Sequence, residues 1–416
     1  MNLDILIYVL ILFWLYRLII LLIIILRSKK VYNKTELNSN IKYFIILPVY
    51  KEEKTIIRTI EFYNNLIWNS KNIYLIVVWT SKERDIVWIN KTIKLAKKYI
   101  KENIIIIEAD TKWFMAHQVN YAVNYIKNTL KTDINNAYFH LINIDTRIKK
   151  EDLFEIFIKI NEWEDILLQS TLFVENFNKI NNFQKAISIY QSRWTLVEEQ
   201  YRILFNRYIS KYKLYHIVWH WLIIKLKKYF QYKMLPEDTI NEDLHFWFYL
   251  SLENEKVYSL TQYEFWDTPT TFHAWFKQII SWFFWLIEYY QYPKSYIQKF
   301  NKKVSIKLIF YTLQWFKNSL QWFITSYYLY FIVLYSIATD NFIIWLISIF
   351  IYFLHYYVFI IWLYKKHIIK EIKLHYFFLT TLIPFIVSTP LTISLFKYLF
   401  YKLWFFTSIK NKTEHE

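Results

Sequence analysis

The chain has 416 residues, which is enough for two or three structural units, and it combines 55% hydrophobic with 20% charged residues. That mixture favours a water-soluble domain joined to membrane segments. Cysteine is absent, which excludes disulfides and thiolate metal sites. The net charge of +17 is spread along the chain, and its clusters at residues 27–30 and 365–373 flank apolar runs. Such clusters are typical of the cytoplasmic flanks of membrane helices, and no basic helix or ribbon favours nucleic acid.

Glycine is absent as well, whereas tryptophan occurs 19 times. Ordinary chains carry about 7% glycine, and only glycine tolerates positive φ freely. Biased codon usage in an A/T-rich genome explains the excess of Lys, Asn and Ile but not a total loss of glycine. Our hypothesis is that UGA codons meaning glycine in the source organism are translated here as tryptophan, and peptide mass spectrometry of the native protein tests it. The positions that suit glycine best are Trp79, Trp113, Trp219, Trp221, Trp247 and Trp285.

Residues 3–26 form an apolar run long enough to span a bilayer. A signal peptide is the alternative, but the run is too long and lacks both a basic start and a small-residue cleavage site. We therefore interpret it as a membrane anchor whose basic flank faces the cytoplasm. Arg17 inside the run is expected to snorkel or to pair within a helix bundle.

Unbroken runs of Ile, Val and Leu then alternate with helical patterns, which predicts βαβ units and a sheet covered on both faces. Residues 214–225 are expected to form a strand pair or loop, and residues 241–252 a helix. The predicted strands are residues 41–49, 72–78, 103–108, 138–143 and 166–174, and the predicted helices between and after them are residues 52–68, 81–100, 112–130 and 183–208.

From Pro269 the sequence changes character. Residues 271–290 are rich in aromatics and suit an interfacial helix, and residues 320–338, 342–364 and 376–400 are predicted spans, the last interrupted by Pro384 and Pro390. The basic loop at 365–373 places the soluble part in the cytoplasm of a multi-pass plasma-membrane protein. The predicted units are an anchor (1–30), a cytoplasmic domain (40–268), interfacial helices (269–318) and C-terminal membrane helices (319–416).

Asn143 and Asp145 directly follow the fourth predicted strand. Open α/β sheets bind ligands at the carboxyl ends of their strands. Two oxygen-bearing side chains at this spacing can hold one hard cation, with phosphate oxygens as further ligands. The structural alternative is an aspartate that stabilises a strand-ending turn.

Four segments occur in an order that resembles the membrane-bound family 2 glycosyltransferases, which include the cellulose-synthase-like and related processive enzymes. They are residues 48–53, 143–145, 241–244 and 278–282, and the resemblance covers about residues 41–285. It implies an α/β fold in which a GT-A-like, Rossmann-type nucleotide-sugar-binding domain is inserted between transmembrane helices.

The resemblance also implies roles in donor binding. Pro48, Tyr50 and Glu52 would cradle the uracil and ribose of a UDP-sugar, and Lys112 at a helix start would approach the diphosphate. Asn143 and Asp145 would bind the nucleotide-sugar through a metal ion, Mg²⁺ or Mn²⁺. The ion would stabilise the leaving UDP as its charge grows.

The resemblance places catalysis on Asp243, as general base for an acceptor hydroxyl, with Glu242 as a supporting hydrogen-bond acceptor. Single attack on the anomeric carbon implies inversion. The alternative is that both residues form a helix cap. Acceptor binding would fall to His220, Gln278 and Trp282, although an interfacial aromatic belt also explains Trp282.

The sequence departs from the family pattern at three places. Asn143 replaces an aspartate, Ser281 replaces an arginine, and the turn after the second strand has no aspartate. We expect an inverting transferase that moves a sugar to a glycan or lipid-linked acceptor at the cytoplasmic face, in contact with membrane lipid and without nucleic acid. The departures leave a second hypothesis, a membrane transporter or scaffold whose catalytically inactive domain senses nucleotide. The few short spans, which lack buried acidic pairs, argue against transport.

Overall fold

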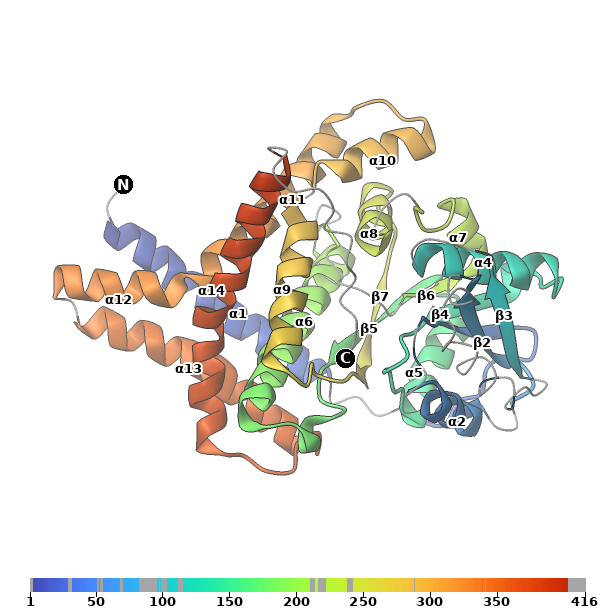
Figure 1. The fold of residues 1–416 in the computed structure, drawn as a ribbon, viewed down its shortest axis with the longest axis horizontal. Helices are drawn as coiled ribbons and strands as arrows, with labels where there is room; N and C mark the ends of the chain where they lie inside the picture. Colours follow the sequence, from blue (N-terminus) through green and yellow to red (C-terminus); the bar gives the residue numbers. More distant parts are fainter. Residues whose placement is uncertain are drawn as a thin grey trace.

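The computed structural model of the chain describes residues 3–28, 32–50, 52, 55–67, 70–81, 96, 98, 103–110, 115–209, 214–215, 222–237, 242–287, 289–340 and 342–402. An α/β unit occupies one end of the molecule and long apolar helices occupy the other, as Figure 1 shows. The predicted fold class, an α/β domain between apolar helices from both ends of the chain, is confirmed.

The described residues form one seven-stranded sheet with the order β3-β2-β1-β4-β6-β5-β7. Only β6 runs against its neighbours, pairing antiparallel with both β4 and β5. Two reversals restore the direction, so the other strands all end at the same side of the sheet, which we call the carboxyl edge. The strands are β1 (Lys42–Pro48), β2 (Ile73–Thr80), β3 (Ile104–Ala109), β4 (Ala137–Leu141), β5 (Ile166–Leu172), β6 (Leu222–Lys225) and β7 (Tyr258–Phe265).

The strands pair as their apolar runs predict. Every residue of β4 and β5 is buried, as expected for strands covered on both faces. Tyr43 of β1 lies opposite Ile73 of β2 on one side and Tyr138 of β4 on the other. The helices of this unit are α2 (Ile56–Ile67), α4 (Met115–Asn128), α5 (Lys150–Asn161), α6 (Asn182–Tyr208), α7 (Leu226–Gln231) and α8 (Glu242–Leu252).

Strand β7 was not predicted. It alternates aromatic or aliphatic residues with polar ones, so it does not resemble the apolar runs of the other strands. Ser259, Thr261 and Glu264 are nevertheless buried, and the last two have polar partners. Glu264 accepts a hydrogen bond from Thr171 Oγ1 at 2.9 Å, and the backbone N–H of Thr261 donates to Glu155 at 2.8 Å. A buried strand that contains polar residues is easily overlooked in a sequence, because it lacks the apolar run of the other strands.

Buried His140 on β4 makes stability depend on pH. Its Nδ1 lies 2.7 Å from the Tyr43 hydroxyl, and burial lowers the pKa of His140 to about 3. The folded state therefore keeps a neutral ring that the unfolded state protonates below its usual pKa of about 6.5. Stability is expected to fall as the pH drops below that value, by about 1.4 kcal/mol per pH unit.

The measurement compares melting temperatures of the wild type and His140→Leu at pH 7.5 and pH 5.5. The variant lacks the titrating ring, so its deficit relative to the wild type should shrink at the lower pH. His273→Leu, at an exposed position of α9, is the matched control and should show no such trend. An equal deficit at both pH values would contradict the expectation.

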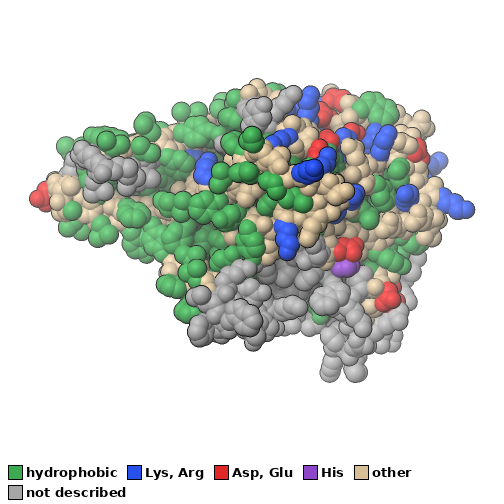
Figure 2. Space-filling view, turned by 90° about the horizontal axis from the view of Figure 1, so that it is seen from above, with side chains coloured by type: hydrophobic (Ala, Val, Ile, Leu, Met, Phe, Trp, Pro, Cys, Tyr) green, Lys and Arg blue, Asp and Glu red, His purple; other side chains and the backbone are tan. Residues whose placement is uncertain are grey.

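Three helices among the described residues are long and apolar enough to cross a membrane: Ile7–Arg27, Phe342–Lys365 and Leu374–Phe400. This indicates membrane association. Figure 2 shows apolar side chains over most of the helical end and the charged ones gathered mainly over the α/β unit. The helices of this part are α1 (Leu3–Arg27), α9 (Phe272–Ile287), α10 (Gln291–Phe300), α11 (Ile306–Ser326), α12 (Tyr328–Thr339), α13 (Phe342–Lys365) and α14 (Leu374–Lys402).

These helices do not form one parallel bundle. In Figure 1, α1, α12 and α13 project away from the sheet, whereas α14 runs crosswise to them beside α9 and α6. The predicted interruption of the last span is wrong, because α14 continues through Pro384 and Pro390. Apolar helices tolerate proline where neighbouring groups satisfy the freed carbonyls.

The predicted span over residues 320–338 is not one straight helix. The chain breaks at Tyr327, and α11 and α12 form a pair bent by 53°. Two hydroxyls next to the break bond back to helix carbonyls, Thr325 to Gln321 at 2.8 Å and Ser326 to Phe323 at 2.6 Å. Such back-bonding competes with the helical hydrogen bonds and bends helices.

The end of α5 bears on the glycine hypothesis. Trp163 has a φ of 65°, and it is the only tryptophan with positive φ among the described residues. Its N–H donates to the Ile160 carbonyl at 3.0 Å, and the next N–H, of Glu164, donates to the Lys159 carbonyl at 3.0 Å. This is a Schellman end, whose left-handed position is usually glycine. We therefore expect the native protein to carry glycine at position 163. Trp113, Trp219 and Trp221 lie outside the described residues.

Candidate active site

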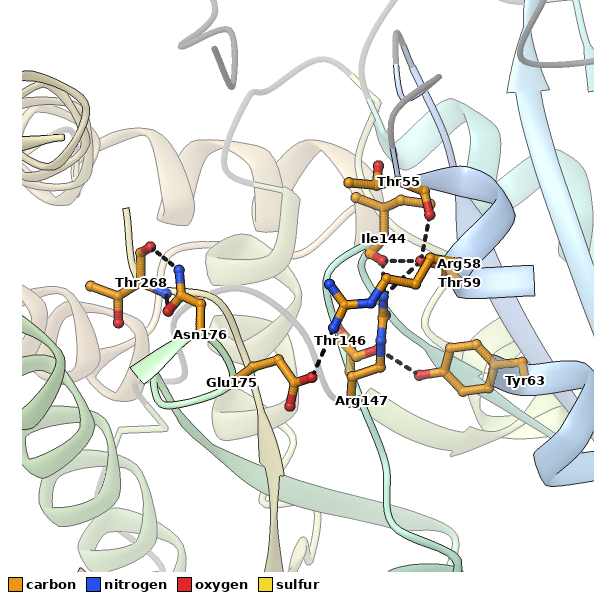
Figure 3. Close-up of polar contacts among 10 residues, drawn as sticks. All are labelled: Thr55, Arg58, Thr59, Tyr63, Ile144, Thr146, Arg147, Glu175, Asn176 and Thr268. Atoms are coloured by element: carbon orange, nitrogen blue, oxygen red, sulfur yellow. Dashed lines mark hydrogen bonds and ion pairs between the residues drawn. The ribbon is translucent and has the colours of Figure 1, made fainter. Parts of the chain in front are cut away.

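The turn that carries Asp145 follows β4 at the carboxyl edge and is held by α2. Thr59 Oγ1 donates to the Ile144 carbonyl at 2.6 Å, and the Tyr63 hydroxyl donates to the Thr146 carbonyl at 3.2 Å. Within the turn, the Asn143 N–H donates to Thr146 Oγ1 at 3.1 Å. Figure 3 shows these contacts from α2. The position of Asp145 is therefore fixed by its neighbours on both sides.

Arg147 completes the support of this turn. Its guanidinium donates to the carbonyls of Ile144 at 3.0 Å and Thr146 at 2.5 Å and to Thr59 Oγ1 at 3.0 Å (Figure 3). It also lies 5.3 Å from the centre of the Phe62 ring. Burial lowers the pKa of Arg147. The side chain acts as a structural cation, because backbone and hydroxyl oxygens occupy its donors.

Strand β7 brings a second carboxylate to Asp145. Arg147 and Phe265 exchange two backbone hydrogen bonds, of 3.0 and 3.1 Å, in an antiparallel bridge. Asp145 lies two residues before Arg147, and Asp267 lies two residues after Phe265, so the bridge brings the two aspartates near each other. Both aspartates therefore belong to one local structure, although 122 positions, the difference between 267 and 145, separate them in the chain.

Asp267 is fixed from its other side as well. The neighbouring residue Thr268 exchanges two hydrogen bonds with the Asn176 side chain, of 2.9 and 2.8 Å (Figure 3). The N–H of Trp266, on the opposite flank, donates to the Leu172 carbonyl at 2.9 Å. Sequence analysis missed Asp267 because β7 itself was missed. The signal was an acidic residue just after an alternating strand.

The electrostatics of Asp145 indicate that three acids lie near one another. Burial raises the pKa of the Asp145 carboxyl well above its usual range, and the negative charges of Asp267 and Glu52 add to this effect, while Arg147 opposes it. Like charges that share a site disfavour ionisation. A divalent cation between these acids would remove the repulsion.

The donor set suits Mg²⁺ or Mn²⁺ only in part. Among the described residues, no group of three His, Cys, Asp or Glu side chains lies close enough to hold a metal ion. Magnesium, however, is usually held by one or two carboxylates together with substrate phosphates. The Asp145 and Asp267 carboxylates fit that arrangement. Half-buried Asn143 lies in the same turn, and its role as a ligand stays a prediction.

The predicted donor-binding residues lie at the same edge. Pro48 ends β1, half-buried Tyr50 follows, and Glu52 accepts a hydrogen bond from Thr55 Oγ1 at 2.8 Å. The turn after β2 lacks an aspartate, but Ser81 at the end of β2 donates to Asp110, which follows β3, at 3.1 Å. Asp110 therefore supplies a carboxylate beside that turn.

Lys112 and His220 lie outside the described residues. Their predicted roles, at the diphosphate and at the acceptor, stay predictions.

Glu242 and Asp243 begin α8, and both are buried. The segment before α8 is held to α4, because Glu237 bonds Asn120 at 2.7 Å and His117 at 3.0 Å. The first turn of a helix favours carboxylates, so this position agrees with the helix-cap alternative and is also compatible with a base. The convergence of Asp145, Asp243 and Trp282 on one cleft stays a prediction.

On the acceptor side, α9 is connected to the carboxyl edge by aromatic rings. The Trp282 ring lies 6.4 Å from the ring of Phe173, which stacks at 5.2 Å on Trp266, the residue before Asp267. Gln278 accepts a hydrogen bond from Gln191 Nε2 at 3.0 Å. Trp282 is the half-buried member of this row, so part of its ring is exposed.

Arg147→Lys tests the support of the Asp145 turn. A lysine ammonium cannot reach three acceptors in the guanidinium geometry, so the variant should lose about 1–3 kcal/mol of stability. Thermal unfolding measures the loss. The matched control is Arg58→Lys, whose exposed pair with Glu175 at 3.2 Å should be worth about 1 kcal/mol or less. Equal melting temperatures for Arg147→Lys and the wild type would contradict the proposed support.

The sequence matches no protein-family model and no curated protein sequence. Among solved structures, the chain is similar to a mannosyltransferase from Pyrobaculum calidifontis in complex with GDP-Man and Mn²⁺, with 10% identity, a TM-score of 0.48, and coverage of 95% of this chain and 99% of that one. It is also similar to S. aureus TarS in complex with UDP-GlcNAc, with 18% identity, a TM-score of 0.38, and coverage of 56% and 60%. These structural neighbours are glycosyltransferases.

Proposed function

We propose that the chain is an inverting glycosyltransferase of the family 2 type. It transfers a sugar from a UDP-sugar to a glycan or lipid-linked acceptor at the cytoplasmic face of the plasma membrane. The observation that carries this proposal is the pair of neighbouring aspartates, Asp145 and Asp267, at the carboxyl edge of a largely parallel sheet, with Glu52 as a third nearby charge. Parallel sheets bind nucleotides at this edge, and paired carboxylates bind a nucleotide diphosphate through a divalent cation.

Different residues at the carboxyl edge bind different parts of the donor nucleotide-sugar. Pro48 and Tyr50 flank the base, and Asp110 accepts a hydrogen bond from a ribose hydroxyl. Asp145 and Asp267 lie where the diphosphate would meet them. The bound cation would supply charge neutralisation for the departing UDP. The hydrogen bonds to the residues that flank both aspartates keep the two carboxylates in position, so they do not have to move during the reaction.

Asp243 accepts the proton of the acceptor hydroxyl as that oxygen attacks the anomeric carbon. The C–O bond to UDP breaks on the opposite face, so the product has inverted configuration. Glu242 supports the same site. Trp282 offers its ring face to the acceptor sugar, and Gln278 forms a hydrogen bond with that sugar.

The ends of the apolar helices support a cytoplasmic position for the α/β unit. Trp362 Nε1 donates to Ser28 Oγ at 3.0 Å, and Lys366 Nζ donates to the Ser28 carbonyl. The C-terminal ends of α1 and α13 therefore lie together, with the cationic loop after α13 beside them. Basic residues at membrane flanks mark the cytoplasmic side. Several apolar helices in one chain favour a multi-pass arrangement.

The test measures release of the nucleoside diphosphate by the purified full-length protein in the presence of Mn²⁺. The donors are a panel of UDP-sugars, which would release UDP, and GDP-mannose, which would release GDP. At least one UDP-sugar should give release that the Asp267→Asn variant loses and Glu175→Gln keeps. Nucleotide-sugar binding without release from any donor would contradict the proposal and would favour the scaffold or transporter. Release from GDP-mannose alone would contradict the assignment of the donor.

A further inference from the structure

A cavity lies at the junction of the α/β unit and the apolar helices, away from the aspartate pair. Residues of α1, α6, α9, α11, α13 and α14 surround it, and the empty space there, open solvent included, is about 630 Å³. It is aromatic along much of its wall. Its aromatic lining consists of Phe13, Trp14, Tyr190, Trp194, Trp322, Tyr352 and Tyr356.

The same cavity is strongly positive. Three arginines line it, Arg17 from α1 and Arg193 and Arg202 from α6, and all are more than nine-tenths buried. Glu198 is the only carboxylate among the described residues of the lining. It pairs with Arg17 and, at 3.2 Å, with Arg202, so one negative charge is shared by two cations. The lining therefore carries an excess of two positive charges.

Arg193 has no carboxylate partner in the part of the chain that the structure describes. Its Nη1 lies 3.1 Å from His355 Nδ1, so that ring nitrogen accepts the bond. Its guanidinium also lies over two rings, 4.7 Å from Tyr356 and 5.8 Å from Trp14. Aromatic faces attract a cation but do not neutralise it.

Several buried donors in the lining have no acceptor within the described residues. They are the Nε–H groups of Arg17, Arg193 and Arg202 and the side-chain amide of Asn318, which is 7% exposed. Burial lowers the pKa of Arg202 to about 10. Buried cations and donors left without partners are costly, and an anion with several oxygens would satisfy them together.

We propose that this cavity binds the phosphate monoester headgroup of a membrane lipid. A phosphate monoester carries nearly two negative charges, which match the two excess positive charges of the lining. Its oxygens can accept hydrogen bonds from the arginine guanidinium groups and from the Asn318 amide. The position of the cavity indicates that this phosphate belongs to a lipid. Part of the cavity lining comes from α1, α13 and α14, whose length and composition suit a bilayer, and the aromatic walls suit the apolar part next to a headgroup. The proposal does not depend on the glycosyltransferase assignment.

A titration of the full-length protein in detergent micelles tests the proposal. The probes are dioctanoyl phosphatidic acid, dioctanoylglycerol without the phosphate, and inorganic phosphate. Phosphatidic acid should bind at least tenfold more tightly than either of the others. Arg202→Gln should weaken its binding tenfold or more. Arg207→Gln is the matched control, because Arg207 lies on the same helix, outside the cavity lining, and pairs with Glu164 at 2.5 Å.

The other outcomes overturn the proposal. Equal binding of dioctanoylglycerol would mean that the cavity recognises only apolar chains, and equal binding of inorganic phosphate would exclude the lipid source. Unchanged binding in Arg202→Gln would exclude the arginines as ligands. Glu198→Gln provides a second test if Arg202→Gln does not fold, because loss of the competing carboxylate should tighten phosphatidic acid binding. Unchanged or weaker binding in that variant would contradict the proposal.

Discussion

Asp145→Asn is expected to lower UDP release by about 10²–10³-fold, the loss that follows removal of one group that stabilises charge in a transition state. Asparagine has nearly the same shape, so the supports from Thr59, Tyr63 and Arg147 stay in place. The loss then reports on the carboxylate charge and not on the fold. Initial rates at saturating donor and Mn²⁺ measure it.

The same substitution should raise the thermal stability of the ligand-free protein. The pKa of Asp145 is raised in the folded state, so folding favours the protonated acid, and stability falls as the pH rises from the ordinary pKa through the raised one. Asparagine removes this penalty. The variant should melt above the wild type at pH 7.5, and the gain should vanish in acid, where Asp145 is protonated in both states.

The matched control is Glu175→Gln, which removes a carboxylate from an exposed pair at the same edge. It should change neither UDP release nor stability by much. An Asp145→Asn variant that is both destabilised and fully active would show that Asp145 only stabilises its turn.

Asp243→Asn is expected to reduce transfer by about 10²–10⁴-fold, the range that general base catalysis contributes. Donor binding should change little, because the base acts on the acceptor hydroxyl. Single-turnover transfer and equilibrium UDP binding separate the two effects. Asparagine is also a good helix-capping residue, so the start of α8 should be preserved.

Asp165→Asn is the control for Asp243→Asn, because Asp165 pairs with Lys225 at 3.5 Å away from the proposed site. A fully active Asp243→Asn variant would mean that Asp243 serves only at the helix start. A variant that loses UDP binding to the same extent as transfer would place Asp243 in the donor site and would contradict the role as base.

The central strands of the sheet could be predicted because their signal is local. Buried parallel strands have apolar runs, and the polar residues after them occupy the carboxyl edge. Asp145 was found in this way. Asp267 was not, because it reaches the site through a backbone bridge between Arg147 and Phe265, which no local pattern encodes.

In the apolar helices, too, contacts between residues far apart in the sequence could not be predicted from local patterns. The prediction that Arg17 snorkels or pairs is confirmed as a pair, and its partner Glu198 lies 181 positions away on α6. The break at Tyr327 depends on side-chain hydroxyls that donate hydrogen bonds to helix carbonyls. A hydropathy profile contains no information on such hydrogen bonds. The three arginines of the cavity come from α1 and α6, which lie far apart in the sequence, so the net charge of the cavity could be recognised only in the structure.

The most direct measurement of the central claim is Mn²⁺ binding to the full-length protein, followed by electron paramagnetic resonance with and without UDP. The pair of neighbouring aspartates, Asp145 and Asp267, predicts that UDP strongly increases Mn²⁺ binding to one site per chain. It also predicts that Asp145→Asn and Asp267→Asn each abolish this increase and that Glu175→Gln keeps it. The same UDP-dependent binding in the wild type and in both aspartate variants would contradict the site.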